Sequence, residues 1–80
     1  MEERRGIPRR RVLKSGTIAF GRAGGYDCTI RNLSDKGACL EVESPVGIPD
    51  IFTLVIPQDA IMRTAHVQWR QAKRIGVVFE

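Results

Sequence analysis

The chain has 80 residues, of which 42% are hydrophobic and 28% charged, and its 13 Lys and Arg against 9 Asp and Glu give a net charge of +4. This length supports one small hydrophobic core, which excludes a second domain and a core that surrounds a deep active site. No apolar run approaches the ~20 residues of a membrane-spanning helix, and no signal-peptide core follows the charged start. We therefore expect a cytoplasmic protein without a membrane span.

The first residues form an arginine-rich segment without hydrophobic periodicity. Six of the 13 cations fall within residues 1–14, where only Glu2 and Glu3 oppose them. Pro8 disfavours helix at the residue before it. We therefore predict a flexible basic arm over residues 1–10 and a single domain over residues 11–80. The charge favours an anionic ligand at this end, although a basic tail that contacts only solvent has the same pattern.

From residue 12 onward, apolar and polar residues alternate as they do in half-buried strands. The predicted strands cover residues 12–20, 26–31, 38–43, 51–56, 61–70 and 75–79. Segment 51–56 is apolar at both parities, which predicts a central or covered strand. Six short strands with no convincing helix predict an all-β fold, a six-stranded antiparallel β-barrel whose closure removes exposed strand edges.

The sequence offers no constellation for catalysis or metal binding. His66 is the only histidine and falls on the polar face of its strand, so an exposed strand histidine is the simpler interpretation. Cys28 and Cys39 have neither a C-x-x-C spacing nor a histidine partner. We interpret both as small buried or half-buried hydrophobic residues. We expect no enzyme activity, no metal and no cofactor.

Two arginines in the arm are placed to converge on one ligand. Arg5 and Arg9 are four residues apart, and the glycine and proline between them bend and stiffen the chain. A guanidinium group binds phosphate, or the O6/N7 edge of guanine, through two parallel hydrogen bonds. The arm therefore suits a ligand that combines phosphate with a purine.

The turn at residues 32–37 supplies neutral polar groups. Asn32 and Ser34 share parity at the end of a predicted strand, so we expect their side chains to point the same way. Gly37 would allow a backbone conformation that is closed to other residues. An ordinary hairpin remains an alternative, in which Asn32 and Ser34 bond only to their own turn.

These two motifs resemble those of the PilZ domain family, which combines R-x-x-x-R with a later [D/N]-x-S-x-x-G. Residues 5–9 match the first motif and residues 32–37 the second, and segments 67–69 and 74–79 resemble the family's last hairpin. The resemblance covers nearly the whole chain. It implies a six-stranded antiparallel barrel that binds the bacterial second messenger cyclic di-GMP on its outer surface.

The resemblance also implies roles for individual residues. The residues implied to bind the ligand are Arg4, Arg5, Arg9, Asn32, Ser34 and Gly37. The arginines would grip guanine edges and phosphates, the polar pair would read guanine, and the glycine would keep the turn open. The first turn position is Asn32 and not Asp. The amide keeps a hydrogen-bond acceptor but lacks the charge of a carboxylate. Trp69 has the parity of Ala65 and Val67, which favours a core position over stacking on a base.

We therefore expect a non-enzymatic receptor and adaptor for cyclic di-GMP, with a downstream protein partner. One alternative is a PilZ-like barrel that binds proteins without binding the nucleotide. The other is a small nucleic-acid-binding barrel. Nucleic acid is the less expected partner, because four of the five aromatic residues have inward parity and leave no stacking platform.

Overall fold

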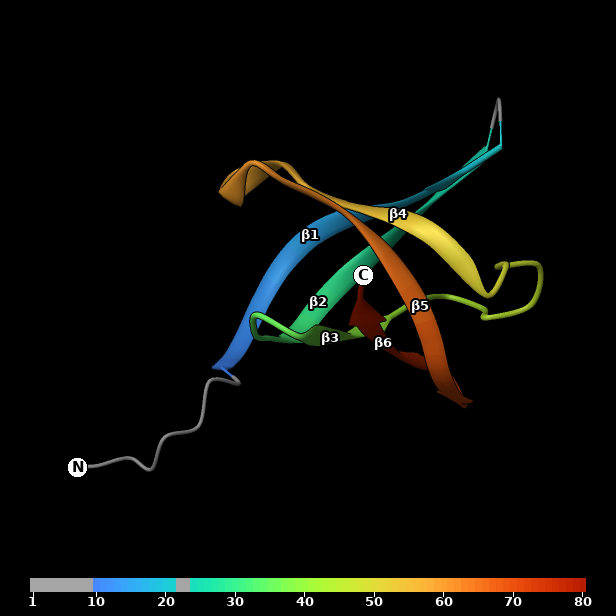
Figure 1. Cartoon of the computed structure of the whole chain (residues 1–80). Helices are drawn as coiled ribbons and strands as arrows, with labels where there is room; N and C mark the ends of the chain where they lie inside the picture. The colour runs from blue at the N-terminus through green and yellow to red at the C-terminus, as the bar shows by residue number, and fades with distance from the viewer. Residues whose placement is uncertain (1–9, 22–23) are drawn as a thin grey trace.

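The computed structural model describes residues 10–21 and 24–80. Six antiparallel strands close into a barrel in the order β1-β2-β3-β6-β5-β4 (Figure 1). The strands are β1 (Arg10–Phe20), β2 (Gly24–Leu33), β3 (Gly37–Glu41), β4 (Ile51–Ile56), β5 (Ile61–Gln71) and β6 (Arg74–Phe79). One 3-10 turn, η1 (Pro57–Asp59), joins β4 to β5, and the described residues contain no α-helix. The predicted fold class is confirmed.

The core forms because each strand turns one set of alternate residues inward. The fully buried large side chains come from five of the six strands, namely Ile18, Ile30, Leu40, Leu54, Ile56 and Ile75. In β4 only one parity is buried, and Ile51 is 55% exposed. The prediction that segment 51–56 is central is confirmed, because β4 pairs with both β1 and β5. Its outer face is not covered.

Three register shifts interrupt the alternation. They lie between Arg11 and Lys14 on β1, between Ile30 and Asn32 on β2, and between Val67 and Trp69 on β5. At each shift one strand carries an extra residue, as in a β-bulge, and the residues beyond it face the opposite side from the one that simple alternation predicts. These bulges decide which side chains reach the outer surface.

The barrel encloses one cysteine and leaves the other at its wall. Cys28 is buried and Cys39 is half-buried, and both thiols are free, so the interpretation of both as small hydrophobic residues is confirmed.

β1 begins at Arg10, the last residue of the predicted arm, and residues 1–9 of that arm lie outside the described part of the chain. Across the described segments, no helix has the length and hydropathy needed to span a membrane.

Burial of Cys28 should make stability depend on alkaline pH. Burial, and secondly the charge of Asp27, raises the pKa of the Cys28 thiol from 9.0 to about 12. Between these values the folded chain keeps the proton while the unfolded chain loses it, so stability should fall as pH rises through this window. Denaturant midpoints measured at increasing pH above 9.0 should fall less steeply in Cys28→Ala than in the parent. Equal slopes would contradict this assignment.

Candidate functional site

The turn between β2 and β3 is closed by Ser34. Its backbone N–H donates to the Gly37 carbonyl oxygen at 2.9 Å, and its Oγ accepts from the backbone N–H groups of Lys36 and Gly37, each at 3.2 Å. The hydroxyl can also donate to the Gly37 carbonyl at 3.4 Å. A hydroxyl has two acceptor lone pairs and one hydrogen. The two backbone N–H groups occupy both lone pairs, so only the hydroxyl hydrogen, which makes a long bond to Gly37, can turn to a ligand. Ser34 would therefore bind a ligand as a donor.

Asn32 lies on the outer face of β2, because a bulge precedes it. Ile30 is fully buried and Leu33 packs against the core, although the two are three residues apart. The extra residue is Arg31, which reverses the alternation, so Asn32 faces away from the core. β2 ends at Leu33, so alternation does not extend to Ser34 and strand parity does not fix the direction of its side chain. The sequence-based argument that the two side chains point the same way therefore loses its basis.

Gly37 is required for a different reason from the one predicted. The backbone of Gly37 is not in the left-handed region, which among the described glycines is limited to Gly21 and Gly47. A Cβ added at Gly37 would lie 2.2 Å from the carbonyl oxygen of Val77 on β6. The predicted special conformation is therefore wrong. The glycine is needed because the backbones of β3 and β6 approach too closely for a side chain.

The turn is also held by an arginine side chain of β5 and a backbone N–H of β6. Arg63 of β5 donates from Nη1 to the Asp35 carbonyl oxygen at 3.0 Å, and its guanidinium carbon lies 4.5 Å from the centroid of the Phe79 ring. The Phe79 backbone N–H donates to the Lys36 carbonyl oxygen at 2.7 Å. These contacts fix the turn relative to β5 and β6. The sequence gives no signal for them, because Arg63 lies 28 residues from Asp35.

Trp69 is exposed, so the predicted core position is wrong. Its exposed fraction is 45%, whereas Val67 packs against the core. The bulge at Gln68 between them reverses the alternation. The indole lies against Gly76 of β6, where an added Cβ would be 2.1 Å from the ring nitrogen Nε1. A glycine inside a predicted strand was the one sequence signal of this close approach.

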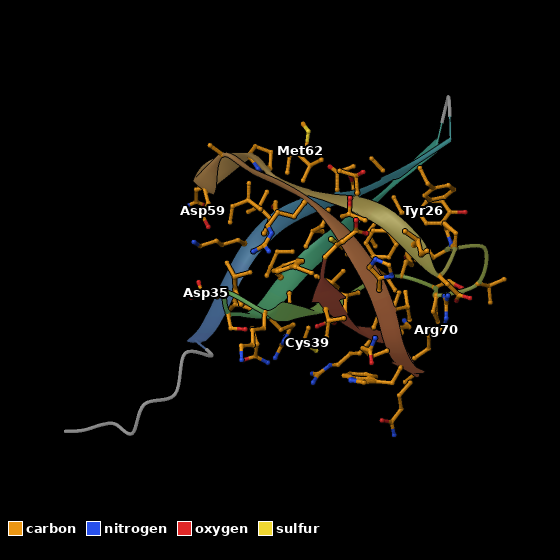
Figure 2. The ribbon with its side chains drawn as sticks, viewed as in Figure 1. Tyr26, Asp35, Cys39, Asp59, Met62 and Arg70 are labelled. Carbon is orange, nitrogen blue, oxygen red and sulfur yellow. The ribbon has the colours of Figure 1, made fainter. Side chains whose placement is uncertain are left out.

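Four residues form a row across the outer face of the barrel, which we call the outer row. Trp69 is opposite Gly76, Gly76 is opposite Cys39, and Cys39 is opposite Asn32. Directly opposed residues of antiparallel strands point to the same face. Figure 2 shows Cys39 on β3 and Asp35 in the turn that precedes this strand. The outer row thus joins an exposed indole to a polar amide across two small residues.

The N-terminal end of β1 continues this row. Arg11 is opposite Asn32, and Arg10 is opposite Leu33. The chain therefore enters the barrel beside the turn at residues 32–37. Arg4, Arg5 and Arg9, which the sequence places in the ligand site, lie outside the described residues.

Charged groups border the outer row. The Arg31 Nη1 lies 3.0 Å from the Glu41 Oε1, with both side chains partly exposed. A pocket of about 450 Å³ lies beside Trp69 and includes Glu41, Lys73 and Arg74. Two cations against one carboxylate give this pocket a net positive charge, which favours an anionic group.

His66 is half-buried on β5, and its Nε2 lies 2.8 Å from the Glu80 Oε1. It thus pairs with the carboxylate of the residue that follows β6. Within residues 10–21 and 24–80, no group of three or more His, Cys, Asp or Glu side chains is placed to hold a metal ion.

Comparison with known families identifies the chain. The profile of the PilZ domain matches residues 3–80, which include both motifs and every strand of the barrel. The chain belongs to the PilZ family. PilZ domains are binding and adaptor modules, and the family is one of cyclic di-GMP receptors. No curated protein matches this chain.

The Gly37 contact predicts a steric cost at one glycine and little at another. Gly37→Ala should lower the free energy of unfolding by about 1–3 kcal/mol, because the new methyl group meets a backbone carbonyl. Gly25→Ala is the matched control, because its Cβ would lie 3.5 Å from the nearest atom, an ordinary contact. This control should change stability by no more than ~0.5 kcal/mol. Urea unfolding of both variants tests the assignment, and equal losses would contradict it.

Proposed function

We propose that this PilZ domain is a receptor for cyclic di-GMP that acts as an adaptor. The nucleotide would lie on the outer face of the barrel, between the R-x-x-x-R arm and the turn at residues 32–37. The observation that carries the proposal is the outer row, which places an exposed indole and a polar amide on one face, beside the point where the arm joins β1. Family membership supports the same ligand.

The arm would supply the positive charge. Arg9 is bonded to Arg10, the strand residue opposite Leu33, so the R-x-x-x-R segment joins the barrel next to the turn. Arg5 and Arg9 would bind phosphates and guanine edges through paired hydrogen bonds, and Arg4 would add a third guanidinium group. Cyclic di-GMP carries two phosphates, so several guanidinium groups can share one ligand.

The barrel would read the bases. Asn32 would accept from guanine N–H groups through its amide oxygen, and Ser34 would donate its hydroxyl hydrogen in place of the long bond to the Gly37 carbonyl. Gly37 would act indirectly, because its close contact with β6 positions the turn. Trp69 packs against a glycine and is 45% exposed, which leaves ring surface for a guanine to stack on.

The adaptor role would follow from where the ligand lies. A nucleotide held by both the arm and the barrel would join them into one composite surface, on which a partner protein can distinguish the bound from the free state. No covalent bond would be made or broken when the nucleotide or the partner binds. The function is therefore binding without catalysis.

Loss of either motif arginine should weaken nucleotide binding. Arg5→Ala and Arg9→Ala should each cost roughly 1.5–3 kcal/mol, the usual value for a hydrogen bond to a charged group. Titration calorimetry with cyclic di-GMP measures this loss, and GTP and cyclic GMP serve as ligand controls.

The matched control is Arg70→Ala, which removes one positive charge elsewhere. Arg70 pairs with Asp50 at 2.7 Å, and in Figure 2 it lies on the opposite side of the barrel from Asp35. This variant should bind cyclic di-GMP like the parent, because Arg70 points to the opposite face of β5 from Trp69 and is held there by Asp50 and the Pro45 carbonyl. Parent-like binding by both arm variants would contradict the site. If the parent itself did not bind, the alternative of a PilZ barrel without nucleotide binding would replace the proposal.

A further inference from the structure

One part of β2 has an unpaired edge. β2 pairs with β1 over its whole length, but its pairing with β3 begins only at Thr29. In the described chain, no backbone hydrogen bond joins residues 24–27 to any segment other than β1. Figure 1 shows the ends of β1 and β2 extending beyond the other strands. Alternate N–H and C=O groups of residues 24–27, which we call the free edge, therefore point away from β1 without a partner.

A groove lies along the free edge. A pocket of about 420 Å³ separates it from the segment after β3, and the lining includes Tyr26, Asp27, Val42, Glu43 and Val46. Figure 2 shows Tyr26 beside this loop, where a Cβ added at Gly47 would lie 3.0 Å from the tyrosine hydroxyl. The groove therefore has an apolar side and a backbone side.

The groove is acidic although the chain is basic. Asp27 and Glu43 line this pocket and also the adjoining one of about 580 Å³, where Glu41 is a third carboxylate and Lys73 the only lining cation. The excess positive charge lies in residues 1–14, whereas residues 15–80 carry seven Lys and Arg against seven Asp and Glu. Carboxylates that gather at the groove therefore give it a local negative charge that attracts a basic ligand.

We propose that the free edge binds an extended segment of a partner protein as an additional β-strand, and that this segment alternates basic and apolar residues. The unpaired N–H and C=O groups select an extended backbone. Tyr26 and Asp27 are adjacent on β2, so their side chains point to opposite faces. A strand paired beside them would place apolar side chains near Tyr26 and basic side chains near Asp27. This surface does not depend on the proposed nucleotide site.

The test is a titration of the full, isotope-labelled chain with a blocked peptide of alternating Lys and Val. The amide signals of residues 24–27, 42–44 and 46–47 should shift, and a peptide of alternating Glu and Val should leave them in place. Two further Lys-Val peptides test the backbone hydrogen bonds separately from the side chains. One carries a methyl group on the backbone nitrogen of every Lys, and the other on the backbone nitrogen of every Val. Only one set of peptide N–H groups faces the edge, so one of the two should bind at least about tenfold more weakly, or ~1.4 kcal/mol.

The matched variants are Asp27→Lys and Glu80→Lys, which make the same charge change inside and outside the groove. Both residues are exposed, so unchanged amide spectra elsewhere would show that each variant is folded. Asp27→Lys should weaken binding of the Lys-Val peptide at least about tenfold, and Glu80→Lys should leave binding close to that of the parent. The proposal is overturned if the Lys-Val peptide does not bind, if both N-methylated peptides bind as well as the parent peptide, or if the two variants behave alike.

Discussion

Barrel closure depends on the pairing of β3 with β6, which brings the two backbones so close at Gly37 that no side chain fits there. Because β3 begins at this contact, the turn before it is held at the end of β6, where the Phe79 N–H donates to the Lys36 carbonyl oxygen. The same register sets Cys39 opposite Gly76. The pairing thus positions the polar turn and decides which residues join the exposed indole in the outer row.

Alternation of apolar and polar residues was sufficient to predict six strands and a barrel, and the predicted segment 51–56 coincides with β4. Alternation was insufficient to predict which face of the sheet a side chain occupies once a bulge has shifted the register. The extra residue Gln68 moves Trp69 from the predicted core to the surface, and no local signal in an unbroken alternating sequence marks that insertion. The Arg63 contact with the turn was also beyond prediction, because it joins residues far apart in the chain. Both motifs were recognisable because their residues are close in sequence.

The two proposed surfaces use different physical means. At the outer row, side chains and the arginine arm would recognise charge and aromatic bases, while the backbone only sets their positions. At the free edge, the backbone itself would recognise an extended segment, and Asp27 would select basic side chains. A small barrel can carry both, because closure is needed only where β2 pairs with β3, and the rest of β2 remains unpaired on one side.

The most direct test is a titration of the isotope-labelled chain with cyclic di-GMP, followed through the indole N–H signal of Trp69, the only tryptophan in the sequence. If the nucleotide lies on the outer row, this signal should move together with the amides of Asn32 and Cys39, while the amides of residues 24–27 stay in place. GTP at the same concentrations should cause little change. Shifts confined to other faces of the barrel, or no shifts at saturating nucleotide, would contradict the proposed site.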